Sequence, residues 1–186
     1  EEIKEAAVKA IRDDINQYAI TWGAVNLRRN LAEKYLWFNG MTIDPDKHIT
    51  VTCGATEAMI CALLATLNPG DKIIVMQPFY ENYWPDGILS GAEPLFVDLH
   101  APDFTFDPSE MKAAFEKGAR AIIINNPNNP TGRVFTREEL QFIADLCIQH
   151  DALAITDEIY EHLLYDSRQH ISLATLPGMM ERTITL

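Results

Sequence analysis

The sequence contains few cysteines and few serines, and these shortages argue against several kinds of enzyme site. The three cysteines form no CxxC pair and the five histidines form no HxxxH pair, so we expect neither a disulfide framework nor a metal site, and the thiols fit a reducing cytosol. None of the serines, at positions 90, 109, 167 and 172, stands in the GxSxG motif of serine hydrolases. The GxGxxG and GxxxxGK[ST] patterns of nucleotide-binding sites are also absent.

The chain also lacks basic runs and long apolar runs. It carries 15 Lys and Arg against 27 Asp and Glu, a formal net charge of −12, and no basic cluster could neutralise a nucleic-acid backbone. The longest apolar stretches, such as 60–67 and 119–124, are much shorter than the roughly 20 residues of a membrane helix, and we recognise no signal peptide. We therefore expect a soluble, cytoplasmic protein without nucleic-acid or membrane partners.

Hydrophobic residues make up 47% of the 186 residues, enough for a core of ordinary size. Apolar residues already have helical spacing in 1–15, and the last four residues alternate like a strand. No linker, repeat or low-complexity tract interrupts the pattern between these ends. We therefore expect a single domain that is part of a longer chain.

Helical spacing and short β-branched runs alternate along the sequence. Helices are predicted at 1–15, 24–38, 57–67, 80–90, 109–117 and 137–150, and strands at 49–52, 72–76, 94–98, 121–125, 152–156 and 183–186. The predicted helix ends include a stop at Asn39-Gly40, Ser109 as an N-cap, and a capping box formed by Thr136 and Glu139. The expected fold is α/β, a three-layer αβα sandwich with a mostly parallel sheet and helices on both faces.

Polar residues just after the strands are the candidates for a site, because ligands of such sheets bind beyond the carboxyl ends of the strands. Gly54, Ala55 and Thr56 follow the strand predicted at 49–52 and open a helix. The free N–H groups of Ala55 and Thr56, with the Thr56 hydroxyl, could bind an anion, most naturally a phosphate. The alternative is a plain N-terminal turn with Thr56 or Cys53 near the cap.

Two further polar segments follow buried strands. Residues 126–132 (NPNNPTG) combine two prolines with a glycine, and such a rigid loop suits amide recognition of a carboxylate or phenolate oxygen, unless it is only a turn. Asp157 follows the strand at 152–156, where a buried carboxylate is costly to ionise without a cationic partner. Asp157 either faces a protonated ring nitrogen, with Tyr160 bound to the same ligand, or caps the next turn.

Three strings carry a resemblance to a known family. They are NNPNNPTGRVFTREEL, ITDEIY and YDSRQHISLATLPGMMERTITL. In them the chain resembles the class I aminotransferases of fold type I, which use pyridoxal 5′-phosphate, and within these the kynurenine and glutamine transaminases. The resemblance covers essentially the whole chain. It implies that residues 1–186 are an incomplete large, cofactor-binding domain of an enzyme that transfers an amino group between an amino acid and a 2-oxo acid.

The resemblance implies roles around the cofactor ring. Asp157 would pair with the pyridinium nitrogen and keep it protonated, so that the ring can act as an electron sink. Tyr160 and Asn129 would hydrogen-bond the phenolate oxygen, with Asn129 also near the substrate carboxylate. Tyr80 would stack on the ring, unless it only packs in the core. Asp157 and Tyr160 are therefore the catalytic candidates of this chain.

The resemblance also implies roles around the phosphate and between subunits. Gly54, Ala55 and Thr56 would hold the phosphate. Tyr18, in the string Asn16-Gln17-Tyr18, would reach the phosphate of the neighbouring subunit, unless it serves only core or surface packing. The active form would be a homodimer with its site at the subunit interface.

One departure from the family limits what this chain does by itself. The family's catalytic lysine, which forms a Schiff base with the cofactor, lies just after the strand that begins at Arg182. The lysines of this chain are at 4, 9, 34, 47, 72, 112 and 117, all before Asp157, so none matches it. The N-terminal segment, and the C-terminal small domain with its substrate-binding arginine, are also missing. We expect this chain to be inactive alone.

Two other functions fit the same residues. A cysteine-conjugate β-lyase would use the same cofactor to eliminate a leaving group from Cβ, although the string Asn129-Pro130-Thr131-Gly132 slightly favours transamination. A non-catalytic chain would use the domain only for association, which the missing lysine supports if the sequence is naturally complete.

Overall fold

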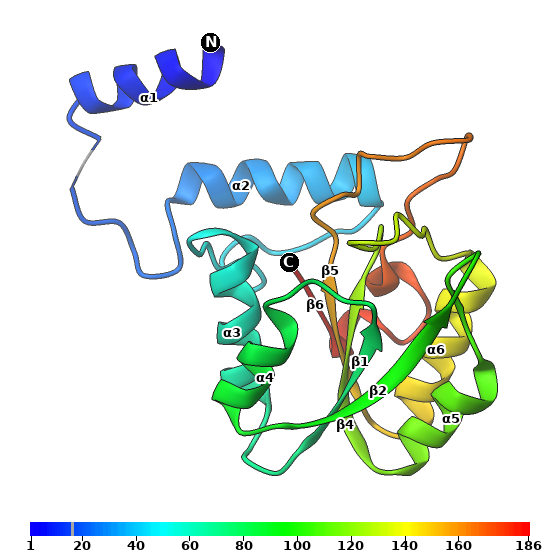
Figure 1. Ribbon diagram of the computed structural model, residues 1–186. Coiled ribbons are helices and arrows are strands. Elements are labelled where there is room, and N and C mark those ends of the chain that lie inside the picture. The colour runs from blue at the N-terminus through cyan, green and yellow to red at the C-terminus, as the bar shows by residue number, and fades with distance from the viewer. Residues whose placement is uncertain (16) are drawn as a thin grey trace.

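The computed structural model describes residues 1–15 and 17–186, and in this part of the chain a six-stranded sheet lies between two layers of helices (Figure 1). The strand order is β3-β2-β1-β4-β5-β6, and all neighbouring strands are parallel except β2 and β3. The strands are β1 (Lys72–Gln77), β2 (Glu93–His100), β3 (Thr105–Phe106), β4 (Ala119–Asn125), β5 (Leu153–Asp157) and β6 (Thr183–Thr185). The helices are α1 (Glu2–Arg12), α2 (Val25–Lys34), α3 (Gly54–Thr66), α4 (Tyr83–Ser90), α5 (Pro108–Glu116) and α6 (Arg137–Gln149), with short helical turns η1 (Tyr35–Asn39), η2 (Leu173–Thr175) and η3 (Met180–Arg182).

The two faces of the sheet carry separate hydrophobic cores. Ile73 and Val75 of β1 pack with α3 and α4 on one face, whereas Ile74 and Met76 pack with α5 and α6 on the other (Figure 1). Because successive side chains of a strand point to opposite faces, a strand covered on both sides is apolar throughout. This confirms the α/β prediction of a mostly parallel sheet with helices on both faces.

The predicted strand at 49–52 is wrong. These residues pair with no strand of the sheet, and the Val51 N–H donates to the Trp22 carbonyl at 3.0 Å. A Cβ on Gly23 would lie 2.4 Å from a Val51 methyl group, so the two segments run against each other. This four-residue β-branched run thus forms an extended connection, and the neighbouring loop at Trp22 accepts one of its backbone hydrogen bonds.

Two predicted helix starts are wrong, and two other predicted helix ends are confirmed. Asp107, not Ser109, caps α5, because its carboxylate accepts the Ser109 N–H at 2.7 Å and Pro108 occupies the first helical position. The helix predicted from residue 80 begins at Tyr83. The capping box of Thr136 with Glu139 is present, and Gly40 ends the second helical region at a φ of 70°.

The first two helices lie outside the three layers. Helix α1 stands apart from the body of the molecule (Figure 1). Ile3 and Ile11 on it are exposed. Helix α2 lies beyond the carboxyl ends of the strands (Figure 1). Lys34 Nζ, at its end, is 2.5 Å from Glu161 Oε1. Among the described residues, no helix has the length and apolar character needed to cross a membrane.

The cysteines are expected to differ in reactivity. Cys147 is fully buried, and burial raises its pKa to about 12, with a smaller opposing effect of Arg182, so its thiol stays neutral and inaccessible. Cys53 and Cys61 are exposed. We expect iodoacetamide at pH 8 to modify these two within minutes and Cys147 only after denaturation, as measured by peptide mass spectrometry. Modification of Cys147 in the folded chain at the rate of Cys53 would contradict this expectation.

Candidate functional site

Asp157 lies at the carboxyl end of β5 as a buried carboxylate with two neutral hydrogen-bond donors. Its side chain is only 7% exposed. The Tyr83 hydroxyl donates to Oδ2 at 2.8 Å, and the backbone N–H of Ile159 donates to Oδ1 at 3.2 Å. Within the described residues no Lys, Arg or His forms an ion pair with this carboxylate. Neutral donors stabilise the charge without cancelling it, so the site suits a cationic ligand group.

Asn125 connects Asp157 with the loop that carries Asn129. It ends β4 directly beside Asp157 in the sheet register, and its side chain is buried. Its Nδ2 donates to the Asp157 carbonyl at 3.0 Å, and its Oδ1 accepts the Asn129 N–H at 2.6 Å. One buried amide therefore fixes both strand ends relative to each other.

The loop after β4 is held by its own side chains. Asn126 Oδ1 accepts the Phe135 N–H at 3.0 Å, and Asn128 Oδ1 accepts the Thr131 hydroxyl at 2.7 Å. The Asn129 side-chain amide has no hydrogen-bond partner within the part of the chain that is described. Asn129 and Tyr160 line the same pocket, of about 580 Å³. The rigid loop predicted at 126–132 thus presents a free amide to a cavity.

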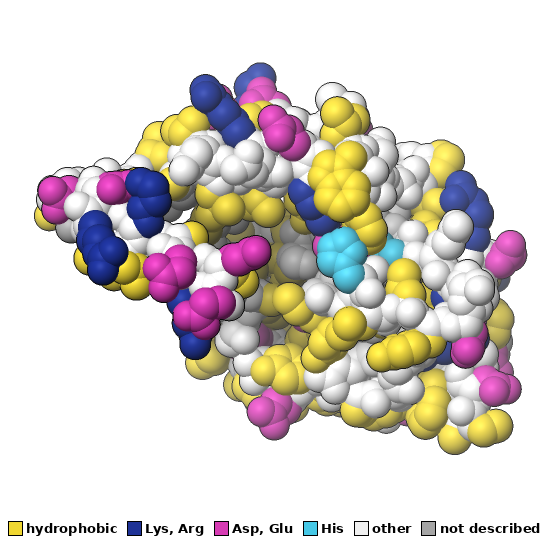
Figure 2. Space-filling view, turned by 90° about the horizontal axis from the view of Figure 1, so that it is seen from above, with side chains coloured by type: hydrophobic (Ala, Val, Ile, Leu, Met, Phe, Trp, Pro, Cys, Tyr) yellow, Lys and Arg dark blue, Asp and Glu magenta, His cyan; other side chains and the backbone are white. Residues whose placement is uncertain are grey.

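The carboxyl edge of the sheet is also the hollowed face of the molecule. Figure 2 views the molecule from above, and its surface has a hollow whose walls include hydrophobic side chains. A ligand at this edge would be partly screened from water, which strengthens its polar interactions with the protein.

The N-terminus of α3 supplies a possible anion site. Gly54 has a φ of 80°, in the left-handed region that favours glycine, and it starts the helix. Ala55 and Thr56 lie in the first turn, where backbone N–H groups have no partner within the helix. The Cys53 side chain makes no capping hydrogen bond, whereas the Glu57 carboxylate accepts the Cys53 N–H. The first-turn amides thus face outward with the positive end of the helix dipole.

Residues before and at the start of α4 join the anion site to Asp157. Asn82 Nδ2 lies 3.4 Å from the Thr56 hydroxyl, and the next residue, Tyr83, reaches Asp157. Tyr80 is partly buried, and its ring packs edge-to-face on Tyr83 with a centroid distance of 5.8 Å. The structure therefore brings Thr56, Tyr80 and Asp157 into one connected group. Tyr80 follows β1 and Asp157 ends β5, whereas Thr56 follows the extended connection at 49–52.

Tyr18 does not join this group. Its side chain is fully exposed, and it belongs to the segment between α1 and α2, away from the sheet (Figure 1). Asn16, which begins the string that suggested its role, lies outside the described residues. The predicted contact of Tyr18 with a neighbouring subunit stays a prediction.

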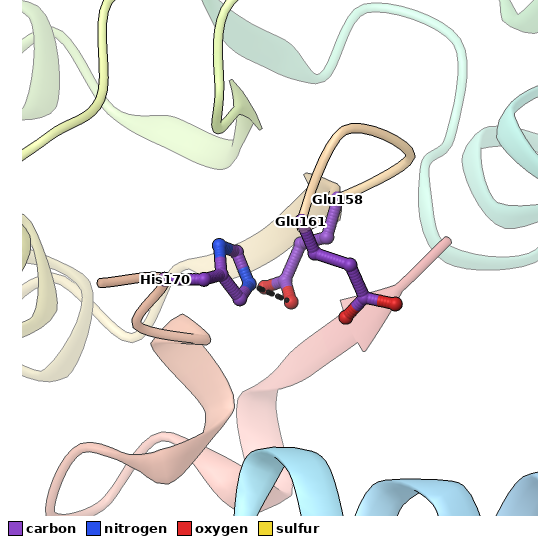
Figure 3. Close-up of side chains that lie close together, drawn as sticks. All are labelled: Glu158, Glu161 and His170. Carbon is purple, nitrogen blue, oxygen red and sulfur yellow. Dashed lines mark hydrogen bonds and ion pairs between the residues drawn. The ribbon is translucent and has the colours of Figure 1, made fainter. Parts of the chain in front are cut away.

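A second polar cluster lies beside the turn that carries Tyr160. Glu158, Glu161 and His170 have ligand atoms within 4.8 Å of one another, and Figure 3 shows the His170 ring directed at Glu158. His170 Nε2 is 2.8 Å and the Ser172 hydroxyl 2.9 Å from Glu158, while Lys34 pairs with Glu161. Both carboxylates therefore already have partners, and the cluster ties the turn to α2 and to the segment before η2.

Sequence reasoning missed Tyr83 and Asn125. Tyr83 is separated from Asp157 by 74 positions, and no local pattern indicates such a contact. Asn125 could have been found, because a polar side chain in the last position of a buried strand needs a hydrogen-bond partner. Both side chains donate a hydrogen bond to Asp157, at the carboxyl end of β5.

The comparison with known families agrees with this geometry. The chain matches the family "Aminotransferase class I and II" over residues 1–186 and therefore belongs to it. Enzymes of this family depend on pyridoxal phosphate. The resemblance inferred from the three sequence strings is thus confirmed.

Individual relatives are similar over nearly the whole chain. It is 42% identical to kynurenine–oxoglutarate transaminase 3 of Rattus norvegicus over 193 residues, which covers 98% of this chain and 42% of the relative. It is 40% identical to kynurenine–oxoglutarate transaminase 1 of Homo sapiens, covering 98% and 46%. The aromatic aminotransferase structure from Pyrococcus horikoshii OT3 superposes with a TM-score of 0.95 at 39% identity, covering 99% and 49%. The chain thus spans less than half the length of these relatives.

Proposed function

We propose that residues 1–186 form part of the large, cofactor-binding domain of a pyridoxal-phosphate-dependent aminotransferase, which transfers an amino group between an amino acid and a 2-oxo acid. One observation carries the proposal beyond family membership. Asp157 is a buried carboxylate at a strand end, and among the described residues it has only neutral partners. A protonated pyridine nitrogen is a cation of suitable size and geometry to pair with this carboxylate.

The other residues fit the remaining parts of the cofactor. The first-turn amides of Ala55 and Thr56 suit its phosphate, since a helix N-terminus favours anions. Gly54 begins this helix, and its own N–H donates to the Thr52 carbonyl at 2.8 Å.

Asn129 and Tyr160 share one pocket, whose lining does not include Asp157, Tyr80 or the first turn of α3. The free amide of Asn129 is linked to Asp157 through Asn125, and with the hydroxyl of Tyr160 it suits the phenolate oxygen.

Tyr80 completes the ring environment, because its partly buried ring, packed against Tyr83, suits stacking. When bound, the cofactor supplies the electron sink for breaking the Cα–H bond of an amino acid. The contribution of Asp157 is to hold a proton on the ring nitrogen.

The site also needs groups from outside this chain. Lys34, at the carboxyl edge of the sheet, is held by Glu161 and lies over the rings of Tyr35 and Phe38, with Nζ 4.4 Å and 5.2 Å from their centroids. We propose that the reactive lysine belongs to the part of the full-length protein that follows, and that a cytoplasmic homodimer brings Tyr18 to the phosphate of its partner. The exposure of Tyr18 supports this arrangement.

The test is a transamination assay of the full-length protein with 2-oxoglutarate and a panel of aromatic and aliphatic amino acids, including kynurenine. We expect pyridoxal-phosphate-dependent glutamate formation from at least one donor, and none from the 186-residue chain alone. Release of ammonia without glutamate from a cysteine conjugate would favour β-elimination. No turnover of any donor by the cofactor-loaded protein would contradict the proposal.

A further inference from the structure

We propose that Tyr83 is a positioning residue for the reaction, which orients the Asp157 carboxylate and keeps its negative charge available to a cationic ring nitrogen. The inference rests on the proposed function and assigns to Tyr83 a role that it exerts through another side chain. Its effect is exerted through the hydrogen bond from the Tyr83 hydroxyl to Asp157 Oδ2, at 2.8 Å.

The position of the Tyr83 ring is fixed from several sides. Tyr83 is the first residue of α4, is 3% exposed and belongs to the core between the sheet and helices α3 and α4. The edge-to-face contact with Tyr80 restrains its ring further. A side chain held in this way can restrict the rotation of a carboxylate better than a water molecule can, because it has little freedom of its own.

The Tyr83 hydroxyl stays a donor over the whole working pH range. Burial raises the pKa of Tyr83 far above its usual value, and the nearby charge of Asp157 and the hydrogen bond to it raise it further. The phenol therefore does not ionise beside the carboxylate. Because the phenol is neutral, it stabilises the Asp157 anion without cancelling its negative charge, which can still attract a cationic ligand.

The carboxylate keeps room for a ligand. Oδ2 accepts from Tyr83 and Oδ1 from the N–H of Ile159, and each carboxylate oxygen can accept two hydrogen bonds. Without the Tyr83 hydroxyl, the buried carboxylate would have a single donor and a higher proton affinity. It would then compete with the ring nitrogen for the proton, and the proton would spend less time on the ring.

The test compares Tyr83→Phe with wild type in the full-length protein loaded with pyridoxal phosphate that is labelled with ¹⁵N in the ring. The ¹⁵N chemical shift against pH reports the protonation of the ring nitrogen directly. We expect the ¹⁵N shift at pH 7 to move toward the value of the unprotonated ring, because a larger share of the proton lies on Asp157, and the single-turnover rate with an amino-acid donor to fall about tenfold, the usual effect of losing a hydrogen bond to a charged group. Cofactor affinity should change by less than about threefold, because the phosphate dominates binding.

Two comparisons separate positioning from mere structural support. Tyr35→Phe removes a hydroxyl from a partly buried tyrosine, which lies near Glu158 and Glu161, and should match wild type. In an Asp157→Asn background, Tyr83→Phe should have no further effect on rate, because its partner charge is gone. An equal rate loss in both backgrounds would overturn the proposal, as would an unchanged ¹⁵N shift at pH 7 in Tyr83→Phe.

A non-natural residue covers the case in which Tyr83→Phe folds poorly. 3-Fluorotyrosine in place of Tyr83 keeps the ring and provides a more acidic donor, so the ¹⁵N shift at pH 7 should move toward the value of the protonated ring, and a shift toward the unprotonated value would overturn the proposal. The wild-type control distinguishes the two proposals. If wild type neither protonates the ring nitrogen nor transaminates, the proposed function fails, whereas a normal wild type with an unaltered Tyr83→Phe refutes only the role of Tyr83.

Discussion

Asp157→Asn in the full-length protein is expected to slow the single-turnover half-reaction with a good amino-acid donor by several orders of magnitude. The neutral amide cannot hold a proton on the ring nitrogen, so the ring loses its capacity to accept electrons as the Cα–H bond breaks. Removing a charge that stabilises developing charge in a dry site costs on the order of 3 kcal/mol or more in the barrier. Cofactor binding should be largely retained, because the phosphate site at α3 is untouched.

A matched control for this variant is Asp98→Asn. Asp98 is also an acid near the carboxyl end of a strand, β2, but it is exposed and bonded to Gln77. Its loss should leave the half-reaction rate unchanged. A rate for Asp157→Asn within threefold of wild type would mean that Asp157 only caps a turn.

Asn125→Ala is expected to have the largest effect on stability among the residues around the site. The substitution removes the acceptor of the Asn129 N–H, in the loop after β4, and one of two donors to the Asp157 carbonyl, which also accepts the Asn126 N–H at 3.1 Å. Leaving the Asn129 N–H unpaired costs about 1–3 kcal/mol and losing the second bond to the Asp157 carbonyl adds about 1 kcal/mol, so the free energy of unfolding should fall by roughly 3 kcal/mol. Urea denaturation followed by circular dichroism measures this change.

The neighbouring Asn126→Ala provides the comparison. Asn126 is as buried as Asn125, but its side chain makes one hydrogen bond, to the Phe135 N–H, and its Nδ2 has no partner. We expect a smaller loss of roughly 1–2 kcal/mol. If Asn125→Ala were the milder of the two, Asn125 would not be the link between the strand ends.

The central sheet could be predicted from sequence because its burial leaves a simple pattern. The runs that form β1, β4 and β5 are almost entirely apolar, since both faces of each strand are covered. The segment 49–52 has a similar composition but no strand beside it, and composition alone does not reveal a missing partner. The predicted start of α5 was wrong for a local reason. Asp107 and Ser109 are both good capping residues, and only the geometry around Pro108 shows which of them is the N-cap.

The candidate site was predictable where a residue's position in the chain determines its place in the fold. Asp157 and Asn129 follow buried strands, so their location at one edge of the sheet could be anticipated. Tyr83 comes to Asp157 only because α4 packs over β1 and β2 with its first residue directed at the end of β5, which depends on tertiary packing. Tyr18 shows the remaining limit, because its predicted partner is another subunit and nothing within one chain determines that contact.

A crystal structure of the full-length protein with pyridoxal phosphate tests the central claim most directly. The account predicts the ring nitrogen within about 3 Å of an Asp157 carboxylate oxygen, a hydrogen-bonding distance. It also predicts the phosphate at the first turn of α3, and Asn129 and Tyr160 on the side of the phenolate oxygen. A cofactor bound elsewhere, or a ring whose nitrogen faces away from Asp157, would contradict it.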